Sequence, residues 1–333
     1  VALGVSLIVV GAPLWGFHWH LINRNLADNI NERISGIRKV FVYSILFLSL
    51  AVLTNAIYQV LQTIFGYKDS AYYQIAVLVP YLGIWGLHWR INSREGFGSY
   101  AGVLLLRIYL YSASVIGLTL MATGAGGIIN ALLQTGYDSA AGVPLILEAN
   151  GGEWVDTVTK PLPTFLTGVL LWSTHWLLLA RADSHNRIRA TFLYLTAIPV
   201  GGLISMSSSA ILINAILGSL LGIYGDESPP FLAISSILVG FLIIFYHWRV
   251  IRLESSNTGK AAHLPSDQVF TYGFSFIGLL FAGPGIAILV YSILTFFLGN
   301  PGEILNSNTV AWREPIVAGL TGLMLGGSVW FFF

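Results

Sequence analysis

The chain has 333 residues, of which 55% are hydrophobic and only 9% are charged; its formal net charge is +1 and it contains no cysteine. Soluble domains carry about 25% charged residues, so this composition excludes an ordinary soluble protein and indicates membrane-spanning segments. The missing cysteines exclude disulfides, thiol catalysis and Cys-ligated metal sites, and the small net charge gives no indication of nucleic-acid binding.

Nine apolar stretches are each long enough to cross a bilayer as a helix, which takes about 20 residues. In chain order they cover residues 1–22, 38–65, 73–91, 102–134, 164–181, 188–223, 231–252, 268–298 and 314–333. Short alternating strands are missing from the sequence, so helices are expected throughout. Both ends of the chain lie inside apolar runs, and the first run lacks the basic start of a signal peptide, so we expect a segment of a longer protein.

A short pattern recurs at the end of alternate stretches. It reads LWGFHW at 14–19, IWGLHW at 84–89, LWSTHW at 171–176 and, more loosely, IIFYHW at 243–248. Its histidines are His18, His88, His175 and His247, and a glycine follows 48, 48, 47 and 52 residues later, at Gly66, Gly136, Gly222 and Gly299. A basic loop and an arginine-led second helix lie between. Glycine just past a helix is the expected C-terminal stop, because it adopts a left-handed conformation at little cost.

This recurring order predicts tandem two-helix repeats that all have the same orientation. The expected boundaries are 1–72, 73–163 with a long outer loop, 164–230, 231–313 and a truncated fifth copy at 314–333. Aligning Trp330 with Trp15 places Phe333 where the fifth histidine would stand, so this copy is expected to lack it. The fold class expected is therefore an all-α integral membrane protein of about nine transmembrane helices in four and a half parallel repeats.

Charge is distributed unevenly between the two ends of the helices. The His-Trp ends hold 13 of the 16 basic residues, and the opposite ends hold nine of the 15 acids. The positive-inside rule therefore predicts that the His-Trp ends face the cytoplasm and that the chain spans the inner (plasma) membrane. Each charged residue falls in a loop or within about one turn of a helix end, which argues against an ion-coupled pathway through the membrane.

The four His-Trp histidines, His18, His88, His175 and His247, are the candidate site residues. A neutral imidazole could ligate haem iron or the magnesium of a bacteriochlorophyll, so these residues are candidates for cofactor binding. The favoured interpretation is an interfacial anchor, because Trp is amphipathic and His at a helix exit is stabilised by the helix dipole. No metal-binding spacing occurs in the sequence, so no metal site is expected.

Small residues cluster at similar depths in the second helices, as ATGAGG at 122–127, GG at 201–202, SMSSSA at 205–210 and AGPG at 282–285. Close helix packing is the favoured interpretation, since small residues let helices approach in lipid. The alternative is a set of kinks around a transported solute, and Pro284 is expected to bend its helix. The amides Asn130 and Asn214 are expected to bond between helices or to line a polar cavity.

The W-x-x-H-W exit, the arginine-led second helix and the Gly-Tyr-Asp stop resemble a prokaryotic, Chloroflexota-type two-helix transmembrane repeat family that is classed as a domain of unknown function. The resemblance covers nearly the whole chain, although the fourth copy lacks the upstream Trp. It implies two-helix units in tandem and brings neither an activity nor catalytic residues.

The function expected from the sequence is a structural, scaffolding or accessory role in a larger membrane assembly, without intrinsic catalysis. No nucleophile elbow, phosphate loop or dinucleotide fingerprint supports an enzyme. The expected partners are membrane lipids and other membrane protein subunits. Two alternatives stay open: a transporter or channel for a neutral or lipid-like solute, and a haem- or chlorophyll-binding subunit that uses the four histidines.

Overall fold

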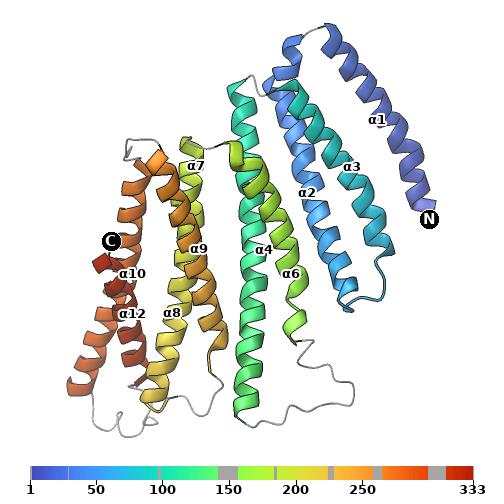
Figure 1. Ribbon diagram of the computed structural model, residues 1–333. Helices are drawn as coiled ribbons and strands as arrows, with labels where there is room; N and C mark the ends of the chain where they lie inside the picture. The colour runs from blue at the N-terminus through green and yellow to red at the C-terminus, as the bar shows by residue number, and fades with distance from the viewer. Residues whose placement is uncertain are drawn as a thin grey trace. The chain divides into compact units, whose positions relative to one another are not determined.

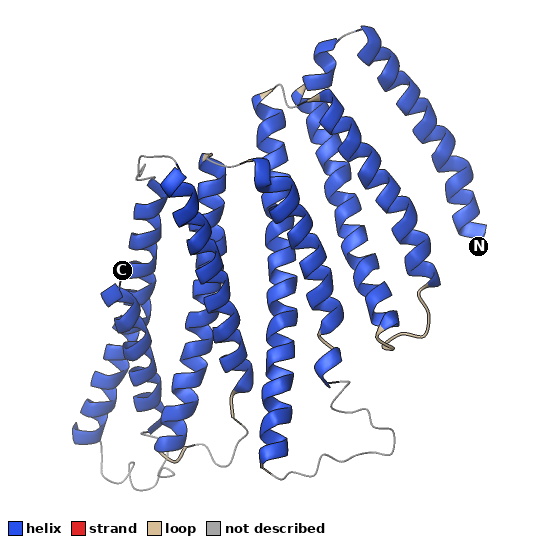
Figure 2. Ribbon diagram, in the orientation of Figure 1, coloured by secondary structure: helices blue, strands red, loops and turns tan. Residues whose placement is uncertain are grey.

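The computed structural model describes residues 2–28, 30–96, 99–141, 157–183, 186–223, 229–257, 265–298 and 313–332. Within these ranges the regular structure is helical, without a strand (Figure 2). The expectations for the outer loop at 142–156 and for Gly299 and Phe333 fall outside the described residues.

The helices follow the predicted apolar stretches closely (Figure 1). They are α1 (Ala2–Asp28), α2 (Gly36–Ile64), α3 (Tyr72–Glu95), α4 (Tyr100–Ala140), α6 (Leu162–Trp172), α7 (Arg187–Phe192), α8 (Ile198–Leu220), α9 (Phe231–Asn257), α10 (Pro265–Leu298) and α12 (Arg313–Phe332). Two wider π-helical segments were not expected: η2 (Ser173–Leu179) prolongs α6, and η4 (Leu193–Ala197) joins α7 to α8. Pro284 lies inside α10 without ending it.

Seven helical segments of the described chain are long and apolar enough to cross a membrane. They are Gly36–Ile64, Tyr100–Ala140, Thr157–Leu179, Ile188–Leu220, Phe231–Glu254, Phe270–Thr295 and Arg313–Phe332. The chain is therefore an all-helical, multi-pass membrane protein. The count of nine crossings stays a prediction, because the helices α1 and α3 are not among the seven.

The chain divides into two compact units, Val1–Ala113 and Ser114–Phe333. In the first unit α2 and α3 pack against each other as an antiparallel pair. The α2 face that becomes buried carries Val42, Leu46 and Leu50, which recur at helical spacing. Tyr109, from the start of α4, contacts the rings of Tyr43 and Phe47 at centroid distances of 5.9 and 5.0 Å.

The second unit contains three antiparallel helix pairs: α4 with α6, α8 with α9, and α10 with α12. In each pair the glycines allow the backbones to approach closely. A Cβ on Gly124 would meet the backbone of Phe165, one on Gly201 would meet the Gly240 carbonyl oxygen at 2.9 Å, and one on Gly285 would meet the Leu323 nitrogen at 2.6 Å. Small residues thus serve as packing surfaces in these pairs, as helices in lipid require.

The glycine stops predicted from the repeat are confirmed at two positions and wrong at a third. Gly66 and Gly222 lie just past α2 and α8 with φ of 81° and 66°, which is the left-handed region that glycine tolerates. Gly136 instead lies inside α4, which continues to Ala140. The side chain of Gln134 donates a hydrogen bond of 2.9 Å to Asp138 across this position, so one exposed glycine is insufficient to end the helix.

Candidate functional site

The histidines of the four His-Trp pairs make the same local hydrogen bond. Nδ1 lies 2.8–2.9 Å from the carbonyl oxygen four residues earlier, which belongs to Leu14, Ile84, Leu171 or Ile243. A carbonyl oxygen only accepts, so Nδ1 carries the hydrogen and donates it. The bond fixes the tautomer and turns the ring back along its own helix. The four copies therefore share a side-chain conformation as well as a sequence pattern.

Burial separates these four histidines. His18 is exposed on α1, whereas His88, His175 and His247 are 3%, 1% and 0% exposed. The tryptophan that follows one histidine packs on the next one along the chain within each unit. Trp19 lies 6.4 Å from the His88 ring, and Trp176 lies 5.9 Å from the His247 ring. The pair therefore joins neighbouring helices at their ends, in addition to the interfacial position expected from the sequence.

His247 has the most enclosed ring of the set. Its neighbours are the rings of Tyr246, Trp176 and Phe192, at centroid distances of 4.9, 5.9 and 6.4 Å. The Nε2 atom of His247 is buried without a hydrogen-bond partner among the described residues. With Nδ1 protonated, Nε2 carries the lone pair that a haem or chlorin metal would need. The lone pair on Nε2 is therefore suited to ligating a metal. A macrocycle at this atom would nevertheless have to displace the surrounding aromatic side chains, so the packing argues against the cofactor hypothesis.

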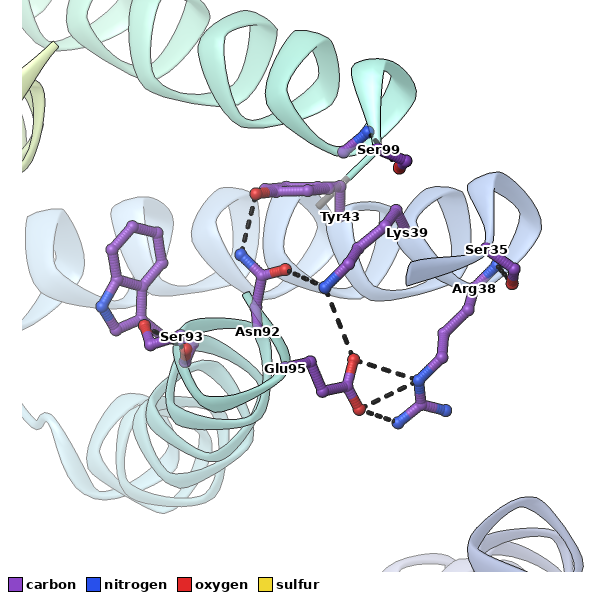
Figure 3. A network of polar contacts seen from close by, with 10 residues as sticks. Ser35, Arg38, Lys39, Tyr43, Asn92, Ser93, Glu95 and Ser99 are labelled. Atoms are coloured by element: carbon purple, nitrogen blue, oxygen red, sulfur yellow. Dashed lines mark hydrogen bonds and ion pairs between the residues drawn. The ribbon is translucent and has the colours of Figure 1, made fainter. Parts of the chain in front are cut away.

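A polar network joins α2 to α3 at the His-Trp end of the first unit (Figure 3). Nε of Arg38 donates to both carboxylate oxygens of Glu95, at 3.0 and 3.1 Å, and its Nη2 forms a further short contact with the same group. The side chains of both residues are only 9% exposed. A two-pronged guanidinium–carboxylate pair of this kind is both strong and geometrically specific. It fixes how the end of α3 lies against the start of α2.

Lys39 extends this network into the space between the two helices. Its side chain is fully buried, and Nζ donates to Asn92 Oδ1 at 3.0 Å and lies 3.5 Å from Glu95 Oε2. The amide of Asn92 in turn donates to the hydroxyl of Tyr43 at 2.8 Å, as Figure 3 shows. Two cations therefore share one carboxylate, and the amide supplies the remaining acceptor. Buried charges are tolerated only when they are paired in this way.

The second unit repeats the ion pair with different residues. Arg189 Nε and Nη2 each lie 2.8 Å from Glu254 Oε1, and Nη1 donates to the Ala180 carbonyl oxygen at 3.0 Å. The guanidinium also lies 4.3 Å above the ring of Trp176, which is a cation–π contact. A helix-capping side chain lies three residues before the arginine in both units: Ser35 bonds to the Arg38 amide, and Asn186 to the Arg189 amide.

The two glutamates were not recognised as site residues from the sequence. Glu95 follows His88 by seven residues and Glu254 follows His247 by seven, which is two helical turns. That spacing was a usable signal, because it places His and Glu on one helix face. Both acids were counted only among the charges near helix ends, so their pairing with Arg38 and Arg189 was not predicted.

Described residues of the second unit line at least two cavities. The larger, about 1020 Å³, is lined by α8, α10 and α12, with Asn214, Ser219 and Thr321 as its polar wall residues. The smaller, about 440 Å³, lies among α4, α8 and α9 and includes the small residues Gly126 and Gly127. Neither wall contains a charged residue or one of the four histidines. These cavities could hold a neutral, largely apolar molecule.

The fold and the polar helix ends thus define an all-helical, multi-pass membrane protein whose helices are joined by ion pairs and aromatic contacts at one end. The chain belongs to the family described as a domain of unknown function, DUF5671, whose model matches residues 1–69 and 107–233. Neither the curated proteins nor the solved structures contain a match to it.

Proposed function

We propose that this chain is a structural or accessory component of a larger membrane assembly, which holds partner subunits in place and carries out no catalysis itself. One observation supports this best: in both units, polar side chains within the helices bond to neighbouring helices. Arg38 and Lys39 bond to Glu95, and Arg189 bonds to Glu254. Side chains used in this way fix helix positions, which is what a scaffold requires.

The proposal includes four and a half tandem repeats that cross the membrane nine times. The recurrence of the histidine hydrogen bond in four copies supports it, as does the recurrence of the capped arginine and its glutamate in two. The helices that pack most closely, such as α2 with α3 and α8 with α9, belong to successive repeats. Contacts of this kind would link each repeat to the next one.

The proposed location is the inner membrane of a bacterial cell, with the His-Trp ends in the cytoplasm. The excess of basic residues at these ends supports this orientation. The proposed partners are lipids and other membrane subunits, because α10 exposes a long series of large apolar side chains. These include Tyr272, Phe276, Leu280, Val290, Leu294 and Phe297. Such a surface within a membrane is covered by lipid tails or by another helix.

Extraction of the native membrane in a mild detergent, followed by native electrophoresis, tests this proposal. We expect the protein in one discrete assembly with defined stoichiometry, and we expect that assembly to dissociate when two α10 side chains, Phe276 and Leu280, are replaced by Asn. The matched control replaces Leu132 and Ile211, which are exposed on other helices. A protein that runs as a free monomer in native membranes would contradict the proposal.

A transporter or channel for a neutral, lipid-like solute is the second candidate, and the cavity of about 1020 Å³ supports it. Its volume is in the range of known small-molecule sites. Asn214 and Thr321 on its wall offer hydrogen bonds to an otherwise apolar solute. Flux of a neutral solute across liposomes that hold the purified chain, abolished by Ala318→Trp in the cavity wall, would favour this candidate over the scaffold.

A further inference from the structure

We propose that the arginine pairs on α3 and α9 bind the phosphate of an anionic phospholipid on the side of the membrane that holds the His-Trp ends. On α3 the pair is Arg90 and Arg94, and on α9 it is Arg249 and Arg252. All four side chains are exposed, and each pair is one helical turn apart on the same face. This surface is distinct from the buried ion pairs, and it does not depend on the scaffold role.

The pairs lack the partners that would otherwise neutralise them. Within the described chain, Arg90, Arg94 and Arg249 form no hydrogen bond or ion pair, and Arg252 lies only above the ring of Trp248, at 5.7 Å. The nearby carboxylates are already used, because Glu95 binds Arg38 and Lys39 while Glu254 binds Arg189. Like charges one turn apart destabilise a helix, and a bound anion would remove this repulsion.

Exposed apolar side chains lie on the helix face next to each pair. On α9 the exposed residues Leu242 and Phe245 continue along the helix face into Arg249 and Arg252, with spacings of three and four residues. On α3 the corresponding apolar residues are Val79 and Leu87, which are also exposed and precede Arg90 and Arg94. A stripe that changes from apolar to basic matches an anionic phospholipid, whose tail would lie on the apolar part and whose phosphate on the basic part.

The presence of two neighbouring arginines at each site indicates the net charge of the preferred lipid head group. Two unpaired guanidinium groups favour a ligand with a net negative charge over a zwitterion that carries the same phosphate. Arginine forms paired hydrogen bonds to phosphate oxygens, and the Trp248 ring beside Arg252 belongs to the residue type that is enriched at membrane interfaces. The site therefore selects phosphatidylglycerol-like lipids over phosphatidylcholine.

Native mass spectrometry of the full chain in detergent, titrated with phosphatidylglycerol or with phosphatidylcholine of the same tails, tests the proposal. We expect phosphatidylglycerol to bind more tightly, and the double variant Arg249→Gln with Arg252→Gln to weaken one site by roughly 25-fold. The double variant Arg90→Gln with Arg94→Gln should weaken a second site. The corresponding Lys variants, which keep the charge, should retain at least part of the binding.

The matched control is Lys68→Gln with Lys160→Gln, which removes the same charge from exposed positions at the opposite helix ends. We expect it to bind phosphatidylglycerol as the wild-type chain does. Equal losses in control and test variants, or wild-type affinity in both arginine double variants, would overturn the proposal. If a variant unfolds, the preference of the wild-type chain for phosphatidylglycerol and its decline with salt provide the test, and equal affinity for both lipids overturns it.

Discussion

Arg189 Nε and Glu254 Oε1 lie 2.8 Å apart although 65 residues separate them in the chain, and Arg38 Nε and Glu95 Oε1 lie 3.0 Å apart across 57 residues. In each unit the arginine lies near the start of a helix, three residues after a capping side chain. The glutamate lies near the end of the helix that packs alongside, which is α3 in the first unit and α9 in the second. The two pairs differ in their surroundings. The carboxylate of Glu95 also contacts Lys39 and is only 9% exposed, whereas the Glu254 side chain, which binds Arg189, is 25% exposed.

Replacing Glu95 by Gln should destabilise the protein strongly. The change leaves Arg38 and the fully buried Lys39 without a counter-charge, and breaking one side of a buried ion pair costs about 3–5 kcal/mol. Thermal unfolding in detergent measures the loss. Glu254→Gln is the matched control, with an expected loss of about 1–2 kcal/mol because solvent reaches that carboxylate. A larger loss from Glu254→Gln than from Glu95→Gln would contradict this assignment.

Replacing Lys39 by Met should have little effect, in contrast to the glutamate. The Arg38–Glu95 pair keeps a one-to-one charge ratio without Lys39, and the change removes the cost of burying an ammonium group between two helices. We expect a change in unfolding free energy within about 1 kcal/mol of zero. The control Lys39→Ala leaves a cavity and should cost about 2 kcal/mol or more. If Lys39→Met proved as damaging as Glu95→Gln, the lysine would be an essential member of the network.

Gly124 and Gly126 provide a matched test of the packing between α4 and α6. A Cβ on Gly124 would collide with the Phe165 backbone, whereas a Cβ on Gly126 would meet nothing within 4 Å. Gly124→Ala should therefore separate the two helices and cost about 1–3 kcal/mol, while Gly126→Ala should be neutral or stabilising by up to ~1 kcal/mol. Thermal unfolding and a cysteine cross-link between α4 and α6 would show the difference. Equal effects of the two changes would mean that the close approach at Gly124 does not form.

Separate alanine substitutions can test that Gly66 ends its helix whereas Gly136 lies inside one. Gly66 has φ of 81° and open space around it, so Gly66→Ala should cost about 1–2 kcal/mol through backbone strain alone. Gly136 lies exposed inside α4, where alanine is the better helix former, so Gly136→Ala should stabilise by up to ~1 kcal/mol. The measurement is the free energy of unfolding. A lower free energy of unfolding in Gly136→Ala would contradict its position inside α4 and would support its role as a helix stop.

The visible absorption spectrum of the purified protein tests the cofactor hypothesis. Tyr246, Trp176 and Phe192 enclose the His247 ring, so we expect no Soret or chlorin band. His247→Phe should retain the packing and cost about 1 kcal/mol for the lost bond to the Ile243 carbonyl. A band in the wild-type spectrum that disappears in His247→Phe would establish ligation and contradict the packing interpretation.

The helices could be predicted from the sequence because hydropathy is a local property. The apolar stretch at 38–65 and the helix Gly36–Ile64 agree to within two residues, as do 268–298 and Pro265–Leu298 to within three. The prediction that a helix ends at Gly136 was wrong, since α4 continues to Ala140. A glycine marks a helix end only when the residues after it also adopt a non-helical conformation. The pairing of Arg38 with Glu95 was missed, since it depends on which helix packs beside α2, and hydropathy carries no such information.

The separation of each ion pair along the chain has a consequence for how the protein is made. When α2 emerges from the ribosome, Arg38 and Lys39 have no carboxylate partner, because Glu95 is synthesised 57 residues later. Burying the two cations before α3 arrives would leave them unpaired at a large free-energy cost, so we predict that α2 and α3 settle together as one hairpin. Arg189 depends on Glu254 in the same way. We therefore predict that these helices settle in pairs during synthesis, with the ion pair forming last at each of the two places.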